Sequence, residues 1–158
     1  MNATYQVSRL PNGVTIATAS MPQMESVCCG LWSVAGSRHE KLEQNGIAHF
    51  VEHLLFKGTP TRDPYAITRE IEGMGASIDA FTTEDHTCYY CRGTAETFPA
   101  MADVLVDIFA HPIFDPGEIE REREVVLDEI AMYRENPRAL PPRPDSRPAG
   151  ARAARASG

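Results

Sequence analysis

The sequence lacks the features that mark membrane-spanning, exported and nucleic-acid-binding proteins. No apolar run reaches the roughly 20 residues needed to cross a bilayer. The first ten residues have neither a basic start followed by an apolar core nor an Arg-rich transit pattern. The net charge is −7, which argues against a nucleic-acid partner because phosphate binding requires clustered Lys and Arg. We therefore expect a cytoplasmic protein with no membrane span and no nucleic-acid ligand.

Cysteine is also scarce, with Cys28 beside Cys29, and Cys88 three residues before Cys91. Both pairs fall in stretches that favour strands, where neighbours and residues three apart point to opposite faces. Neither pair then forms a good chelate. We predict reduced, mostly buried thiols rather than a redox pair or a zinc site.

Large aliphatic residues are almost missing from the last part of the chain. Residues 137–158 contain five Pro, five Arg and six Ala, with Leu140 as the one larger aliphatic residue. Such a segment buries too little apolar surface to offset its ordering entropy. We predict a domain over residues 1–136 and a disordered tail over 137–158. The abrupt change in composition is what a truncated or frame-shifted reading produces, and a natural short form is the alternative.

The rest of the chain predicts an α+β fold. Alternation around Asn12-Gly13 indicates a hairpin of two short strands, and a nearly continuous apolar run at 26–35 indicates a strand buried on both faces. Caps and prolines mark helices, with Asn45, Asp63 and Asp115 as N-caps. The predicted strands are 5–10, 14–19, 26–35, 76–81 and 86–93, and the predicted helices are 46–56, 64–74, 96–110 and 116–135. This order favours a mostly antiparallel sheet covered by helices on one side.

The strongest chemical signal is the sequence HFVEH at residues 49–53. On a helix, positions i, i+3 and i+4 share a face, so His49, Glu52 and His53 project together. Two imidazoles four residues apart can bind one zinc ion, and a neighbouring carboxylate can act on water beside it. The order HxxEH is an inverzincin signature. The alternative is an ordinary half-exposed helix, and a catalytic zinc also needs a third protein ligand.

The Glu-rich helix expected at 116–135 offers candidates for that ligand. Glu122 and Glu129 are seven residues apart and share one helical face. Glu129 lies between Leu127 and Ile130, and a carboxylate on a half-buried face requires a partner, of which a metal is one candidate. For most acids of this helix, a solvated surface is the simpler interpretation.

Taken together, these motifs closely resemble the pitrilysin-type zinc peptidases, which include the mitochondrial processing peptidase and bacterial processing-protease-like proteins. The likeness covers nearly all of residues 4–136, through LPNGVTIAT, the GSRHE loop, GIAHFVEHLLFKGT, GASIDAFTTEDHTCYY and EREREVVLDEI. It implies that His49, His53 and Glu129 bind zinc and that Glu52 is the base that activates water. Glu122 matches an acidic residue that supports the site without binding the metal.

The resemblance also implies how a substrate binds. The strand at 76–81 matches the edge strand on which these peptidases place an extended peptide by main-chain pairing. Asp79, Ala80 and Phe81 are therefore expected substrate contacts, although Asp79 stands where the family often has Asn. Family members are several times longer, with a second domain that closes over the substrate. We expect a zinc metalloendopeptidase acting on extended or unfolded peptides, alone or with a complementary domain or second copy. The alternative is a non-catalytic zinc-binding fragment or assembly subunit.

Overall fold

An antiparallel hairpin opens the computed structural model, which describes residues 3–135. Strands β1 (Thr4–Arg9) and β2 (Thr15–Ser20) pair with each other and form a separate two-stranded sheet. Gly13 takes a positive φ of 93° in the connecting turn, where the Asn12 side chain accepts a hydrogen bond from the Val14 N–H at 3.2 Å. The Asn-Gly prediction is confirmed, whereas the predicted tail at 137–158 lies outside the described residues.

The main sheet has three strands in the order β3, β5, β4, and both pairings are antiparallel. These strands are β3 (Ser26–Ser33), β4 (Ser77–Thr82) and β5 (Thr87–Thr94). Alternate residues of β4, namely Ile78, Ala80 and Thr82, are partly buried, and the residues between them are exposed. Within residues 3–135, β4 therefore forms an edge of the sheet and presents one of its faces to the core.

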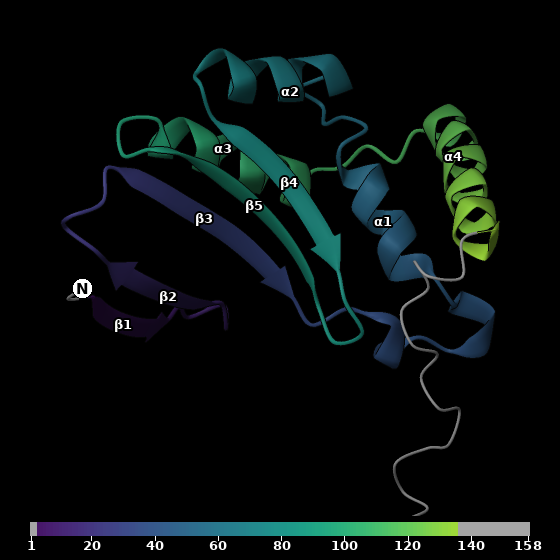
Figure 1. Cartoon of the computed structure of the whole chain (residues 1–158), viewed down its shortest axis with the longest axis horizontal. Helices are drawn as coiled ribbons and strands as arrows, with labels where there is room; N and C mark the ends of the chain where they lie inside the picture. Colours follow the sequence, from purple (N-terminus) through teal and green to yellow (C-terminus); the bar gives the residue numbers. More distant parts are fainter. Residues whose placement is uncertain (1–2, 136–158) are drawn as a thin grey trace, which may run out of the picture.

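Helices cover a single face of this sheet (Figure 1). They are α1 (Ile47–Leu55), α2 (Pro64–Gly73) and α3 (Phe98–Ala110), and they supply Leu55, Ile67, Ile71, Met101, Val104, Leu105 and Ile108 to the core. The sheet contributes Tyr89 and Cys91 from β5. The last helix, α4 (Pro116–Glu135), packs against α1. The α+β class with an antiparallel sheet covered on one side is confirmed. No helix in the described part of the chain is long and apolar enough to cross a membrane.

The prediction that residues 26–35 form a strand buried on both faces is wrong. Val27, Cys29 and Leu31 pack against the core, but the side chains between them point away from the helices, and Trp32 is 62% exposed. The apolar run misled because an apolar outer face and an inner face look alike in sequence. In the described residues only one face is covered.

The predicted N-cap of the first helix is also wrong, because Gly46, not Asn45, precedes α1. Gly46 has a φ of 93° and provides no side chain, so the free N–H groups at the helix start need another acceptor. Glu40 supplies it from the preceding loop, accepting from the Gly46 N–H at 2.6 Å and the Ala48 N–H at 2.8 Å. A carboxylate also interacts favourably with the positive end of the helix dipole.

The two Asp-Pro helix starts are confirmed. Asp63 accepts a hydrogen bond from the Ala66 N–H at 2.7 Å, and Pro64 occupies the first helical position of α2. Asp115 accepts from the Gly117 and Glu118 N–H groups at 2.9 and 3.1 Å. Both helices thus begin where their local sequences indicate.

All four cysteines are free thiols, as predicted. Cys88 and Cys91 are buried, Cys29 is half-buried and Cys28 is exposed. Cys29 lies directly opposite Cys91 in the pairing of β3 with β5. Burial raises the pKa of the Cys91 thiol to about 12, which keeps it protonated and unreactive at neutral pH.

Candidate metal centre

Helix α1 lies beside strand β4, between this strand and helix α4 (Figure 1). Its core side is anchored by buried Leu54 and Leu55. The helical spacing then places His49, Glu52 and His53 on the remaining, partly buried surface. Side chains of α1, α4 and β4 meet there.

Three potential ligands converge at this place. One donor atom each from His49, His53 and Glu129 lies within 4.8 Å of the other two. The Nε2 atoms of the two histidines are 3.3 Å apart, and His53 Nε2 is 3.8 Å from Glu129 Oε2. Two nitrogens bound to one tetrahedral zinc at about 2.0–2.1 Å are about 3.3–3.4 Å apart. The histidine pair therefore matches the spacing of ligands on a single ion, and a His₂Glu donor set suits zinc.

Glu122 orients the second histidine from the buried side of the site. Its Oε1 lies 2.9 Å from His53 Nδ1, and its side chain is only 7% exposed. An ionised carboxylate can only accept, so Nδ1 carries the proton and Nε2 keeps a lone pair directed at the cluster. Burial opposes the charge of Glu122, but hydrogen bonds from Lys57 and His53 prevail and lower the pKa of Glu122 below its ordinary value. Glu122 is thus a charged acceptor that fixes the imidazole.

Glu52, the acidic residue between the two histidines on α1, is held by the main sheet. The Thr82 hydroxyl donates a hydrogen bond to Glu52 Oε2. Thr82 Oγ1 lies 3.2 Å from Thr87 Oγ1, and the Thr87 hydroxyl donates to the Ala35 carbonyl at 2.8 Å. Burial and the nearby Glu52 charge both raise the pKa of Tyr89. Thr82 of β4, with Thr87 of β5 beside it, therefore holds the Glu52 carboxylate against the main sheet.

The three predicted substrate contacts divide between two faces of β4. Ala80 faces the core, whereas Asp79 and Phe81 are exposed on the outer face. Phe81 packs against Trp32 and His86 there, with ring centroids 5.7 and 6.1 Å away. The Ala80 N–H donates to Asp79 Oδ1 at 2.8 Å. The side chains of Asp79 and Phe81 are therefore on the face away from α1.

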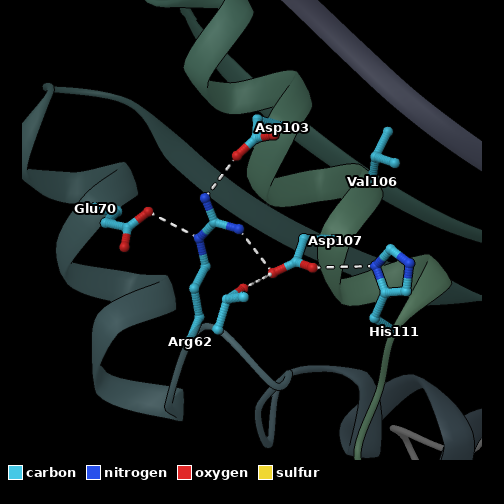
Figure 2. Close-up of a pocket in the computed structure, with 7 residues that line it drawn as sticks. Arg62, Glu70, Asp103, Val106, Asp107 and His111 are labelled. Carbon is cyan, nitrogen blue, oxygen red and sulfur yellow. Dashed lines mark hydrogen bonds and ion pairs between the residues drawn. The ribbon is translucent and has the colours of Figure 1, made fainter.

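A separate pocket of about 440 Å³ lies between α2 and α3 (Figure 2). Arg62 spans it and contacts Glu70 at 2.9 Å, Asp103 at 2.6 Å and Asp107 at 2.7 Å. Asp107 also accepts from Thr59 at 2.7 Å. The polar groups that line the pocket pair with one another. We therefore interpret it as a structural contact between α2 and α3 rather than as a catalytic site.

Two residues in contact with the site were missed by sequence reasoning, namely Thr82 and Lys57. Lys57 Nζ lies 2.5 Å from Glu122 Oε2. A signal for Thr82 was present, because alternation along β4 places it on the same face as Ile78 and Ala80, where a hydroxyl requires a partner. Lys57 had a weaker signal: it follows His53 by four residues, the spacing of one helical face.

The fold and the donor set together define a class: two histidines and a glutamate around one point, with a further glutamate beside them, are typical of zinc metallopeptidases. The family model described as insulinase (peptidase family M16) matches residues 15–148. The chain belongs to this family. The resemblance to pitrilysin-type peptidases is thereby confirmed.

Relatives of known sequence carry names that agree with this class. The chain is 43% identical over 126 residues to the uncharacterized zinc protease YmxG of Bacillus subtilis, covering 80% of this chain and 31% of that protein. It is 44% identical over 124 residues to the mitochondrial-processing peptidase subunit beta of Saccharomyces cerevisiae, covering 78% of this chain and 27% of the relative. The chain thus spans about 30% of the length of these relatives.

Solved structures show the same architecture. A protease from Helicobacter pylori aligns with a TM-score of 0.81 at 22% identity, over 85% of this chain and 32% of that one. Pitrilysin aligns with a TM-score of 0.74 at 29% identity, over 85% of this chain and 14% of the other. The fold around α1 and the main sheet is therefore that of the corresponding part of these larger proteins.

Proposed function

We propose that this chain carries the catalytic centre of a zinc-dependent endopeptidase that hydrolyses peptide bonds in extended or unfolded peptides. The observation that carries the proposal is the convergence of His49, His53 and Glu129 within 4.8 Å. These residues come from two helices far apart in sequence, and they meet only because α4 packs on α1. Membership in the M16 family and the names of the zinc protease relatives support the same activity.

His49 Nε2, His53 Nε2 and a Glu129 carboxylate oxygen would hold the metal. When bound, zinc supplies a Lewis acid that polarises the scissile carbonyl and makes water more acidic. Glu122 keeps the His53 ring oriented through Nδ1. Replacing a residue that hydrogen-bonds to a metal ligand typically lowers the metal affinity by about 10–100-fold.

Glu52 is the proposed general base. It precedes His53 on α1, and its Oε2 is held by the Thr82 hydroxyl. The Glu52 carboxylate would take a proton from the attacking water and return it to the nitrogen of the leaving amine. Because Thr82 belongs to the sheet, the position of the base relative to a peptide on β4 is set by the packing of α1 against that strand.

Strand β4 is the proposed substrate platform. It forms an edge of the main sheet in the described residues, and an edge strand can pair with an extended peptide through main-chain hydrogen bonds. Thr82 of this strand contacts Glu52, so a peptide paired along this edge would pass close to the proposed base. The Ala80 N–H donates to Asp79 Oδ1, and a substrate carbonyl that pairs with this amide would replace that bond.

A second candidate is a zinc-binding subunit that needs a complementary chain for turnover. The observation in its favour is the 44% identity to a protein that is itself named as a subunit, the mitochondrial-processing peptidase subunit beta. The zinc site would be the same in both cases. Only turnover by the isolated chain separates them.

The test is zinc stoichiometry together with peptide cleavage by the purified chain. The proposal predicts one zinc per chain and cleavage of an unfolded peptide that stops with a chelator and returns when zinc is added. One bound zinc without cleavage at any enzyme concentration would favour the subunit. A chain that binds no zinc would contradict both candidates.

A further inference from the structure

Lys57 is one of only two lysines in the sequence. It contacts Glu122, the carboxylate that also contacts the proposed ligand His53. Helix α1 ends at Leu55, but the Lys57 N–H still donates to the Leu54 carbonyl at 3.0 Å, so the chain continues to turn. Lys57 is four residues beyond His53, as His53 is beyond His49. Its side chain therefore extends along the side of α1 that faces α4.

The lysine completes the contacts of one carboxylate. Glu122 contacts His53 Nδ1 through Oε1 at 2.9 Å and Lys57 Nζ through Oε2 at 2.5 Å. Both oxygens of a side chain that is 7% exposed are thus occupied by different partners. A carboxylate held at both oxygens cannot rotate without breaking a charge-assisted bond.

We propose that Lys57 is a positioning residue of the metal centre, which acts through Glu122 on the orientation of the His53 ring. Its contribution is geometric and electrostatic at once. It fixes the plane of the carboxylate, and it balances a negative charge that would otherwise be buried with only an imidazole beside it. Without Lys57, the Glu122 carboxylate can turn away from Nδ1 or toward the metal, and His53 Nε2 loses its fixed direction. The inference depends on the zinc site of the proposed function.

The experiment measures zinc affinity by competition with a chromogenic chelator, so it requires no turnover. Lys57→Met keeps most of the side-chain length and removes the charge, and we expect zinc to bind about 10-fold more weakly. Lys57→Arg keeps a cation near Glu122 and is expected to stay within about threefold of the wild type. Lys41→Met, at the other lysine, which is exposed on the loop before α1, is the matched control and is expected to bind zinc normally.

A double-mutant cycle separates positioning from general stability. If Lys57 acts through Glu122, Lys57→Met has no further effect on zinc affinity in a Glu122→Gln background. A purely structural role would instead lower the melting temperatures of the zinc-free and zinc-bound forms equally and leave the affinity unchanged.

Normal zinc affinity in Lys57→Met, or equal effects of Met and Arg, would overturn this inference and leave the zinc site standing. Additive effects of Lys57→Met and Glu122→Gln would also overturn it. A wild-type chain that binds no zinc would overturn the proposed function, and this inference with it. If Lys57→Met does not fold, Lys57→Gln takes its place in the same cycle.

Discussion

Thr82 donates a hydrogen bond to Glu52, and this contact joins the edge strand of the sheet to the helix that carries both histidines. The two residues are 30 positions apart. The contact holds the proposed base in one orientation, because Thr82 is itself next to Thr87, whose hydroxyl is anchored on the Ala35 carbonyl.

Removing the Thr82 hydroxyl tests this contact. Thr82→Val keeps the shape of the side chain, and we expect it to lower kcat for peptide cleavage by about 10-fold, part of the 10²–10⁴-fold typical of general-base catalysis. KM and zinc content should change little, since neither a ligand nor the strand backbone is altered. Thr82→Ser restores the donor and should recover most of the activity. Equal kcat values for the Val variant and the wild type would show that the hydroxyl does not position Glu52.

Changing the base itself should separate metal binding from turnover. Glu52→Gln removes the proton acceptor and leaves the three proposed ligands in place. We expect full zinc occupancy with cleavage reduced at least 10²-fold, measured by metal analysis and peptide hydrolysis on the same preparation. Wild-type cleavage by this variant would rule out Glu52 as the base.

Glu129→Gln should have the opposite effect. The amide oxygen is a poorer zinc ligand than a carboxylate, so zinc should be lost on dialysis, and the rise in melting temperature caused by added zinc should shrink. Asp128→Asn is the control, because Asp128 is exposed and is the neighbouring acid on α4. Unchanged zinc retention in Glu129→Gln would remove Glu129 from the set of ligands.

The cap of α1 can be tested without reference to catalysis. Glu40→Ala removes the acceptor of the Gly46 and Ala48 N–H groups, and we expect a loss of about 1 kcal/mol in the free energy of unfolding, as for other helix caps. Asn45→Ala, at the position that the sequence favoured as the cap, should change it by only a few tenths of a kcal/mol. Urea unfolding of both variants decides between the two caps. A larger loss for Asn45→Ala would contradict the structure.

The stability of the folded protein in acid should depend on Asp107, which lines the pocket between α2 and α3. Burial alone would raise the pKa of Asp107, but hydrogen bonds from Arg62 and two threonine hydroxyls outweigh it and lower the pKa from 3.8 to about 2. Because the folded-state pKa is depressed, the stabilisation is present above about pH 4 and disappears as the pH falls toward 2.

Asp107→Asn should therefore destabilise the protein by about 2 kcal/mol at pH 7, and the difference from the wild type should shrink between pH 4 and pH 2. Urea unfolding at several pH values measures it. Asp103→Asn, whose side chain is 69% exposed, should cost much less. A difference that is constant with pH would show that the charge of Asp107 does not carry the effect.

Most of the fold could be read from the sequence because its signals are local. The Asn12-Gly13 turn and the proline-marked starts of α2 and α4 depend on residues within a few positions of one another. The same holds for the spacing of His49, Glu52 and His53, since helical geometry alone places them on one face. The cap of α1 could not be predicted in this way, because Glu40 reaches the start of this helix from a separate loop. The exposure of β3 could not be predicted either, because no local pattern distinguishes an inner from an outer apolar face of a strand.

The sequence by itself determined which side chains can bind a metal or transfer a proton, and it determined the helix that carries His49, Glu52 and His53. Helical spacing offered Glu122 and Glu129 as candidate partners, and the resemblance to a family assigned each of them its role. Tertiary structure alone decided how these groups are held: α4 packs on α1 and brings Glu122 to His53, and β4 brings Thr82 to Glu52. The physical reason is range. Backbone periodicity and capping act over a few residues, whereas contacts between α1, α4 and β4 depend on how all three pack.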